Sequence, residues 1–218
     1  MKGFIPYQWT KLNQEEQIVK SRELFEEMKE RRSIRGFSED AIPKEAVLNA
    51  IRIAGSAPSG ANKQPWTFCL VEDSTLKRKI RLAAEEEEKL NYAERMSETW
   101  LEDLKKFGTN WEKPFLEKAP YLIVVFKKAY DVEEDEKKQN YYVNESVGIA
   151  CGFLLMALHQ CGLYTLTHTP SPMKFLTDIL GRPSNERPYL LIPVGYPEKY
   201  LEVPDIERKK IEEILAVY

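Results

Sequence analysis

Tyr121 to Phe126 reads YLIVVF, and this run is the clearest candidate for a buried strand in the chain. All six side chains are apolar or aromatic, which is typical of a strand covered on both faces of its sheet. Three further short runs, Thr67 to Val71, Tyr164 to Thr167 and Tyr189 to Val194, are also predicted to be strands. Pro193 in the last run cannot donate a ladder hydrogen bond, so it indicates an edge position or a bulge.

Between these strands, apolar residues recur at helical spacing. Helices are therefore predicted at residues 14–30, 43–55, 74–88, 146–163 and 172–180. Ser74 is expected to cap the third of these helices and Gly162 to end the fourth. The helix over Ser146–Leu163 is apolar nearly all round, so we expect it at the centre of the fold or at a subunit interface.

The remaining segments are expected to lie mainly on the surface. Tyr130 to Gln139 is rich in charge and predicts a loop, and Ile211, Ile214 and Leu215 give the C-terminal tail a helical pattern. Residues 89–117 mix aromatic and charged side chains and predict a helical insertion that folds back over another part of the chain. Because helices alternate with short strands, residues 1–218 are predicted to form one α+β domain, with an α/β-type mixed sheet flanked by helices.

The composition argues against several functional classes. The 218 residues carry a net charge of −3, which argues against non-specific binding to nucleic acid. No apolar run reaches the ~18 residues that a membrane span needs, so no membrane contact is expected. His159 and His168 form no metal-ligand pattern with the three cysteines, so no metal is expected. An odd number of cysteines without a CxxC pair fits a reducing compartment, and the chain is expected to be cytoplasmic.

The segment Arg31-Arg32-Ser33-Ile34-Arg35 places three guanidinium groups within five residues. The planar fork of arginine grips phosphate oxygens two at a time, so this cluster suits a dianionic phosphate. If the preceding helix continues, Arg31 and Arg35 are four residues apart and share a face. The competing interpretation is a basic, solvated helix end, because positive charge is favourable at the C-terminal end of the helix dipole.

Two further loops offer groups that bind ligands. Residues 57–66 are a run of turn formers in which Pro58-Ser59-Gly60 exposes backbone amides. Thr167-His168-Thr169-Pro170 follows a predicted strand, at the kind of position where α/β sheets bind ligands. The sequence contains no GxGxxG, GxxxxGK[ST] or GxSxG motif, so it supports no Rossmann dinucleotide site, P-loop or serine hydrolase.

These segments together resemble the nitroreductase family of flavoproteins, and within it the iodotyrosine deiodinases, which dehalogenate halotyrosines reductively. The resemblance covers nearly the whole chain from about Glu26. The arginine cluster and the Pro-Ser-Gly loop indicate only the wider family. The more specific features are the acidic run Glu85 to Glu88 followed by Asn91-Tyr92, and Thr109-Asn110-Trp111 followed by Lys113.

The resemblance implies a homodimer with FMN at the subunit interface and an NAD(P)H-dependent reductant. The residues that it assigns to FMN are Arg31, Arg32, Ser33, Arg35, Pro58, Ser59, Gly60, Thr167, His168, Thr169 and Arg208. The arginines would hold the phosphate, and Pro58-Ser59 would contact the isoalloxazine. Thr169 would be the catalytic residue, because a hydrogen bond from its hydroxyl to flavin N5 would favour one-electron transfer. The alternative for Thr169 is a strand-end hydroxyl that satisfies its own backbone.

The resemblance also implies a site for a free halogenated amino acid under a lid of about residues 85–115. An ammonium and a carboxylate can be buried only against opposite charges. Glu88 would bind the ammonium and Lys113 the carboxylate, and Tyr92, four residues after Glu88, would add a hydrogen bond. The backbone N–H of Ala61 would bind the phenolate oxygen. The alternative is that Glu88 and Lys113 are ordinary surface charges.

The predicted function is FMN-dependent reductive dehalogenation of halotyrosines, in which 3-iodo-L-tyrosine gives L-tyrosine and halide. One alternative is a general NAD(P)H-dependent nitroreductase or quinone reductase, in which Glu88, Tyr92 and Lys113 are incidental. Another is a non-catalytic protein that binds flavin or an aromatic amino acid. His168 departs from the pattern of animal deiodinases, which typically carry threonine there, so it is assigned backbone contact with the flavin and no acid–base role.

Overall fold

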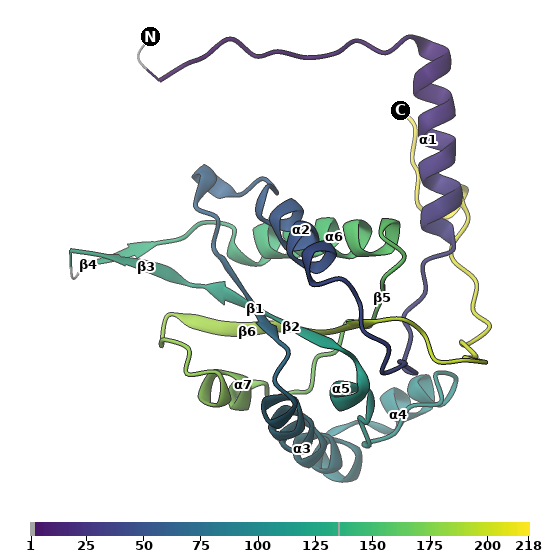
Figure 1. Cartoon of the computed structure of the whole chain (residues 1–218), viewed down its shortest axis with the longest axis vertical. Coiled ribbons are helices and arrows are strands. Elements are labelled where there is room, and N and C mark those ends of the chain that lie inside the picture. The colour runs from purple at the N-terminus through teal and green to yellow at the C-terminus, as the bar shows by residue number, and fades with distance from the viewer. Residues whose placement is uncertain (1–2, 135) are drawn as a thin grey trace. The chain divides into compact units, whose positions relative to one another are not determined.

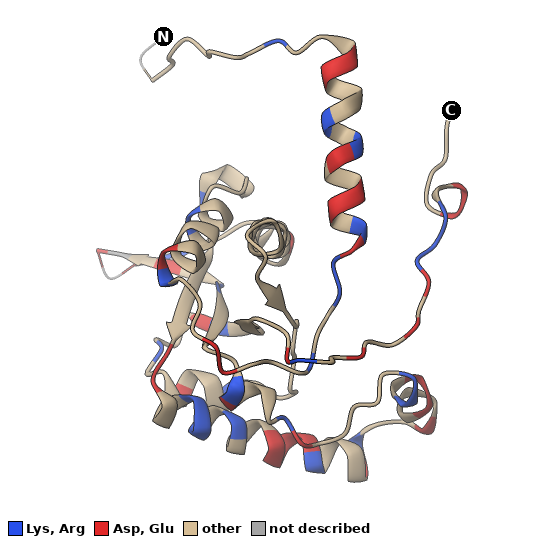
Figure 2. Ribbon diagram, turned by 45° about the vertical axis from the view of Figure 1, so that its right-hand side comes forward, with Lys and Arg blue, Asp and Glu red and all other residues tan. Residues whose placement is uncertain are grey.

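The computed structural model describes residues 3–134 and 136–218, and the chain divides into two compact units, Met1–Arg31 and Arg32–Tyr218 (Figure 1). The smaller unit contains helix α1 (Gln14–Lys29), close to the predicted limits. Asn13 caps this helix, because its side chain accepts a hydrogen bond from the Glu16 amide at 2.9 Å and its own amide donates to the Glu16 carboxylate at 2.9 Å. Charged residues of both signs follow one another along α1 (Figure 2), and the helix buries none of its residues.

The larger unit contains helices at most of the predicted positions. They are α2 (Lys44–Gly55), α3 (Ser74–Leu90), α4 (Glu98–Lys105), α5 (Phe115–Lys118), α6 (Val143–Gln160) and α7 (Lys174–Ile179). Shorter turns are η1 (Gly60–Asn62), the π-helical η2 (Asn91–Arg95) and η3 (Ile211–Glu213). The cap of α3 is Asp73, whose carboxylate accepts a hydrogen bond from the Leu76 amide at 2.8 Å, so the prediction of Ser74 was wrong by one residue. Gly162 (φ +70°) follows the end of α6 in the left-handed conformation that terminates helices, as predicted.

A four-stranded sheet in the order β1-β2-β6-β5 forms the centre of the larger unit. Its strands are β1 (Trp66–Val71), β2 (Tyr121–Lys128), β5 (Tyr164–Thr165) and β6 (Glu186–Gly195). These strands pair antiparallel, and a parallel bridge between Ser33 and Thr165 makes the sheet mixed at its edge. The YLIVVF run lies in β2, which has a neighbour on each side, so its apolar composition follows from its central position.

Side chains alternate along β2 between two apolar cores, one on each face of the sheet. Leu122, Val124 and Phe126 pack in the core that contains residues of α3, α5 and α7. Ile123 and Val125 pack in the other core, with residues of α2 and α6. Figure 1 shows these two groups of helices on opposite faces of the sheet. The arrangement confirms the predicted α+β fold, a mixed sheet flanked by helices.

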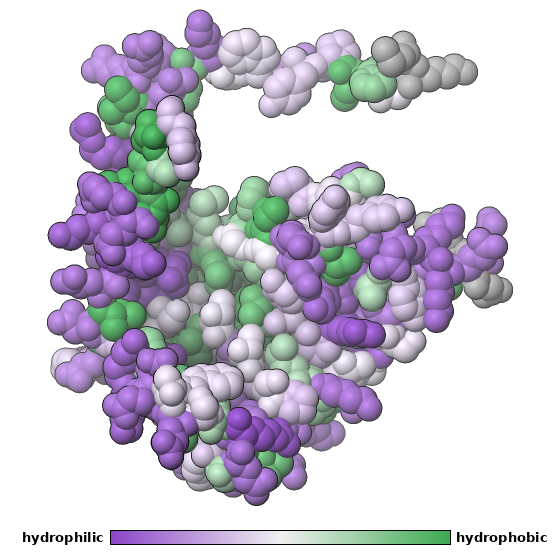
Figure 3. All heavy atoms as spheres, turned by 180° about the vertical axis from the view of Figure 1, so that it is seen from behind, coloured by the Kyte–Doolittle hydropathy of each residue, from purple (hydrophilic) through white to green (hydrophobic). Residues whose placement is uncertain are grey.

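Two of the surface predictions were wrong. Tyr130 to Gln139 forms a hairpin of β3 (Tyr130–Glu133) and β4 (Glu136–Gln139) rather than a loop, with Asp135 outside the described residues. The sequence shows no sign of these strands, because a hairpin that buries neither face does not need alternating apolar and polar residues. The C-terminal tail is helical only at η3, and Ile211, Ile214 and Leu215 are exposed. Figure 3 shows apolar side chains, in green, on the surface of the molecule.

Pro193 does not mark an edge or a bulge, because β6 is internal and Pro193 pairs in register with Leu122. The register shift lies at Tyr189, where Leu190 pairs with Val125 and Pro188 with Phe126. Proline is tolerated at this internal position because β5 pairs only with Val194 and Gly195 on that side. Among the described residues, no helix has both the length and the apolar character to cross a lipid bilayer.

Candidate active site

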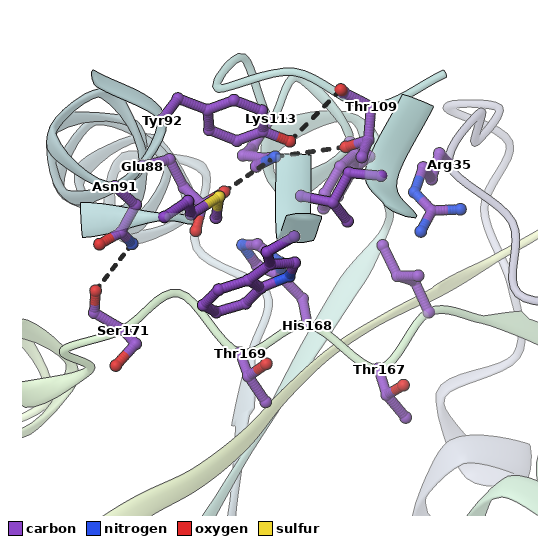
Figure 4. A pocket seen from close by; sticks show the side chains of 15 residues that line it. Arg35, Glu88, Asn91, Tyr92, Thr109, Lys113, Thr167, His168, Thr169 and Ser171 are labelled. Carbon is purple, nitrogen blue, oxygen red and sulfur yellow. Dashed lines mark hydrogen bonds and ion pairs between the residues drawn. The ribbon is translucent and has the colours of Figure 1, made fainter. Parts of the chain in front are cut away.

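A cavity of about 240 Å³ lies where α3, η2 and α4 meet the segment that follows β5 (Figure 4). It is enclosed by residues from the end of α3 through the start of α5, by the strand-end segment, and by one arginine of the N-terminal cluster. The lining residues are Arg35, Glu88, Asn91, Tyr92, Met96, Trp100, Leu104, Thr109, Lys113, Phe115, Leu166, Thr167, His168, Thr169 and Ser171. The chain therefore brings together most of the residues predicted for substrate, but fewer of those predicted for the cofactor.

Glu88 and Lys113 form a buried ion pair at this cavity. Glu88 lies on α3 and Lys113 precedes α5, and Glu88 Oε2 and Lys113 Nζ are 3.1 Å apart. Their exposed fractions are 7% and 3%, so neither is an ordinary surface charge. Burial lowers the pKa of Lys113, and the charge of Glu88 opposes that shift. Opposite charges held out of water in this way can receive the two charges of an amino acid.

Every N–H group of the Lys113 ammonium has an acceptor nearby. Besides Glu88, the ammonium lies 3.4 Å from Thr109 Oγ1 and donates to the carbonyl of Asn110. An ammonium has three donors, so this set satisfies it. A carboxylate that binds Lys113 must therefore replace one of these partners.

Tyr92 lies on η2, one turn beyond Glu88, and its phenol donates a hydrogen bond to the Thr109 carbonyl at 3.3 Å. Burial raises the pKa of this phenol, so it stays protonated and remains a donor. The side-chain amide of Asn91 donates to the Ser171 carbonyl at 2.8 Å. These two hydrogen bonds tie η2 to both walls of the cavity, and Figure 4 shows Glu88, Tyr92 and Lys113 side by side above the strand-end segment.

The strand-end segment supplies Thr167, His168 and Thr169 to the cavity. His168 pairs with Leu191 through both backbone groups, at 2.9 and 3.0 Å, so only the second lone pair of its carbonyl is left for a cofactor. Its imidazole lies edge-on against Phe115, with the ring centroids 5.5 Å apart. Burial, followed by the charges of Lys113 and Arg35, lowers the pKa of His168 to about 3. A side chain that is neutral near pH 7 agrees with the assignment of no acid–base role.

The arginine cluster is not helical, so the prediction that Arg31 and Arg35 share a helical face was wrong. α1 ends at Lys29, and the chain then becomes extended as the Ile34 amide donates to the Thr165 carbonyl at 3.2 Å. Arg35 lies over the ring of Phe107 at 5.7 Å from its centroid, and burial lowers its pKa.

A second cavity, of about 460 Å³, shares Arg35 with the first and is also lined by Ser33. Arg32 donates to the carbonyl of Pro204 and lines neither cavity. Arg208 is in the exposed tail and also lines neither cavity, and Arg31 belongs to the smaller unit. Of the arginines predicted to hold the phosphate, Arg35 therefore lines these two cavities, and Ser33, predicted for the cofactor, lines the second.

The loop from Pro58 to Ala61 does not line the first cavity. It packs near the start of α6 instead, where the Gly60 amide donates to Ser146 Oγ at 3.3 Å. A side chain at Gly60 would meet the Tyr142 ring at 2.9 Å. Ala61 has φ +50°, a left-handed conformation that costs energy for any residue with a Cβ. Such strain is found where a backbone group must point in one direction, which is common at ligand sites.

The sequence analysis missed several lining residues and one buried carboxylate. The lining residues are Met96, Trp100, Leu104, Phe115, Leu166 and Ser171. The spacing of four between Trp100 and Leu104 signals a common helical face, but gives no indication of what that face covers. The buried carboxylate is Glu85, which is indistinguishable in sequence from its neighbours in the acidic run.

Comparison with known proteins places this site in a family. Residues 28–196 match the model of the nitroreductase family. The chain is 59% identical over 217 residues to an iodotyrosine deiodinase of Haliscomenobacter hydrossis, covering 99% of this chain and 98% of that protein. It is 46% identical over 216 residues to the human iodotyrosine deiodinase 1, covering 97% of this chain and 74% of the human protein.

A solved structure is similar over most of the fold. It is the crystal structure of an oxidised iodotyrosine deiodinase bound to FMN and 3-iodo-L-tyrosine, with a TM-score of 0.76 and 34% identity. The match covers 89% of this chain and 97% of that one. On this evidence, the chain belongs to the nitroreductase family and, within it, to the iodotyrosine deiodinases.

Proposed function

We propose that this protein catalyses the FMN-dependent reductive dehalogenation of halotyrosines and converts 3-iodo-L-tyrosine to L-tyrosine and iodide. The observation that carries the proposal is the buried Glu88–Lys113 pair at the 240 Å³ cavity. Reduction of nitro compounds or quinones has no need for two opposite charges held out of water. The named relatives, and the solved structure with FMN and 3-iodo-L-tyrosine, support the same reaction.

Substrate binding would exchange one internal ion pair for two intermolecular ones. The substrate ammonium pairs with Glu88 and its carboxylate with Lys113, and the Tyr92 hydroxyl adds a hydrogen bond. Because the charges of receptor and ligand match one for one, no charge is left buried without a partner. Residues 85–115 act as the lid that keeps water out of this exchange. The Ala61 N–H binds the phenolate oxygen at the other end of the substrate.

The described residues fit FMN as the cofactor. Arg35 is a half-buried guanidinium, and burial lowers its pKa. Among the described residues, no carboxylate contributes to raising that pKa again. An anionic ligand relieves the cost of such a group. Arg31, Arg32, Arg35 and Arg208 would hold the phosphate, and Ser33 would also contact the cofactor. Reduced FMN supplies two electrons, which with one proton replace the carbon–iodine bond by a carbon–hydrogen bond and release iodide.

The remaining assigned residues surround the flavin ring. Pro58, Ser59 and Gly60 contact the isoalloxazine, and Thr167 and the His168 carbonyl border it. The Thr169 hydroxyl would donate a hydrogen bond to flavin N5 and so tune its electron transfer. The position of Thr167, His168 and Thr169 at the cavity supports this assignment.

We further propose that the working form is a homodimer of single-domain chains with FMN at the interface. The Pro58–Ala61 loop of one copy then completes the cavity of the other. The left-handed Ala61, and the contact of this loop with α6 rather than with the cavity, support this arrangement. Exposed apolar residues support it too, because Phe25 on α1 and Ile214 in the tail are 64% and 68% exposed in the single chain.

The electrons come from an NAD(P)H-dependent reductant, which we propose together with a cytoplasmic setting. The support for the reductant is the family resemblance. The support for the setting is the odd number of cysteines, three, which suits a reducing compartment.

The test is an anaerobic reaction of the dithionite-reduced holoenzyme with 3-iodo-L-tyrosine, followed by chromatography. We expect tyrosine and iodide in equal amounts over many turnovers. A parallel assay with a nitrofuran and NADPH provides the contrast. Rapid nitrofuran reduction without any tyrosine would overturn the proposal in favour of a general nitroreductase.

A further inference from the structure

Lys113 is held at both ends by carboxylates from the same helix. Its ammonium pairs with Glu88, and its backbone N–H donates to Glu85 Oε1 at 2.8 Å. Glu85 and Glu88 are three residues apart on α3 and therefore lie on neighbouring positions of one helix face. Both carboxylates are buried, each with 7% of its surface exposed.

Glu85 is itself fixed by a second, part-buried contact. Its other oxygen, Oε2, accepts a hydrogen bond from Arg81 Nη1 at 2.9 Å, one turn earlier on α3. The Nε of Arg81 donates to Glu117 Oε2 at 2.7 Å, and Glu117 lies on α5. Lys113, Glu85, Arg81 and Glu117 are thus linked in series, and this network of contacts joins α3 to the start of α5.

This network of contacts fixes the position of Lys113 within the lid. Residues 89–112, which make up most of the lid, separate Lys113 from Glu88 in the sequence. Chain connectivity alone therefore does not place the Lys113 ammonium against the Glu88 carboxylate. A hydrogen bond from the Lys113 backbone N–H to a buried carboxylate fixes the position from which the side chain extends. A charged acceptor in a buried site gives a strong hydrogen bond, and the loss of that acceptor leaves the amide unsatisfied.

We propose that Glu85 is a positioning residue for substrate recognition, which places Lys113 to bind the substrate carboxylate. The inference rests on the proposed function and adds to it a residue that touches neither substrate nor cofactor. Its action is selective. It serves the carboxylate end of the ligand, because the ammonium end binds Glu88, which α3 holds directly.

The experiment compares Glu85→Ala, Glu85→Gln and the control Glu86→Ala, which changes the exposed neighbour in the same acidic run. Quenching of FMN fluorescence in the holoenzyme gives the dissociation constants of 3-iodo-L-tyrosine and of 3-iodotyramine, which lacks the carboxylate. Glu85→Ala should weaken 3-iodo-L-tyrosine at least tenfold and 3-iodotyramine less than threefold. Glu85→Gln keeps an oxygen acceptor and should recover most of the affinity, and Glu86→Ala should change neither constant.

Several outcomes would overturn the proposal. An equal loss for both ligands would make Glu85 a general structural residue, and no loss for either would remove it from recognition. If Glu85→Ala does not fold, Arg81→Met takes its place, since it frees Glu85 from its clamp and should show the same preference at smaller amplitude. An unmodified holoenzyme that does not bind 3-iodo-L-tyrosine would instead refute the proposed function, before any variant is measured.

Discussion

The two halves of the proposed site differ in how completely one chain builds them. On the lid side, Glu88, Tyr92 and Lys113 come from separate segments, yet they meet at one cavity, with 3.1 Å between the paired charges. On the loop side, Pro58 to Ala61 hold a strained backbone but contact the start of α6 rather than the cavity. Under the proposed function, the residues that recognise the charges meet within one chain, whereas the Ala61 N–H proposed for the phenol lies away from that cavity and is assigned to a second copy.

The largest effect is expected on the lid side, from Lys113→Met. The change removes the donor for the substrate carboxylate and leaves Glu88 buried without its partner. The dissociation constant of 3-iodo-L-tyrosine should rise at least a hundredfold, or about 2.8 kcal/mol. Fluorescence quenching of FMN measures it, with Lys79→Met on the exposed side of α3 as the matched control. Equal affinities in the two variants would show that the buried pair does not bind substrate.

Glu88→Gln should have the next largest effect. The amide keeps the shape of the side chain but removes the charge that faces the substrate ammonium. We expect the dissociation constant of 3-iodo-L-tyrosine to rise at least tenfold, or about 1.4 kcal/mol. A ligand without the ammonium, 3-(4-hydroxy-3-iodophenyl)propionate, should lose much less. Equal losses for the two ligands would assign Glu88 a structural role only.

Thr169→Ala tests the segment after β5, which lines the first cavity. Loss of the hydroxyl should slow dehalogenation several-fold relative to nitrofuran reduction, because one-electron transfer is no longer favoured over hydride transfer. The measurement is the ratio of the two rates in the reduced holoenzyme, which cancels differences in FMN content. Thr169→Ser retains a hydroxyl and serves as the control. If the ratio is the same in the unmodified protein, Thr169→Ala and Thr169→Ser, the Thr169 hydroxyl is not the donor to flavin N5.

The last prediction concerns stability rather than binding, and it is made for His168→Gln. The folded chain holds the pKa of His168 at about 3, while an unfolded chain has the ordinary histidine value of 6.5. Between these values the unfolded state binds more protons, so the free energy of unfolding falls as the pH decreases from 6.5 toward 3. His168→Gln should flatten this fall, and urea unfolding at pH 7 and pH 5 measures it. An unchanged slope would show that the imidazole accepts its proton in the folded protein.

Much of the fold was predictable, because burial on both faces leaves a mark in composition. The apolar run YLIVVF predicted β2, and apolar residues at helical spacing predicted α1, α2, α3 and α6. The hairpin at Tyr130 to Gln139 was not predictable, since strands that bury nothing carry no apolar alternation. Pro193 gave a wrong prediction of an edge or a bulge. The sequence does not show that β5 is too short to pair with β6 at Pro193, which is why proline fits in an internal strand.

The site was predictable where a resemblance named its residues, and unpredictable where only geometry distinguishes them. Glu85 and Glu86 are adjacent and chemically identical, yet the structure buries Glu85 against Lys113 and exposes Glu86. Arg31 and Arg35 seemed to share a helical face, but pairing of Ser33 with Thr165 draws the chain out of the helix. Such choices depend on contacts between segments that are distant in sequence.

The measurement that tests the two-copy account most directly is complementation between two inactive variants. Lys113→Met damages the lid side. Ala61→Pro damages the loop side, because proline lacks the N–H and cannot adopt the φ of +50° found there, so each homodimer should be inactive with 3-iodo-L-tyrosine. If the two halves of a site come from different copies, a mixed dimer has one site with both lesions and one site with neither. Co-expression should then restore about a quarter of the wild-type rate, because about half of the dimers are mixed, each mixed dimer has one intact site of two, and the homodimers contribute no activity. A co-expressed sample as inactive as the two homodimers would contradict the account and place the complete site within one chain.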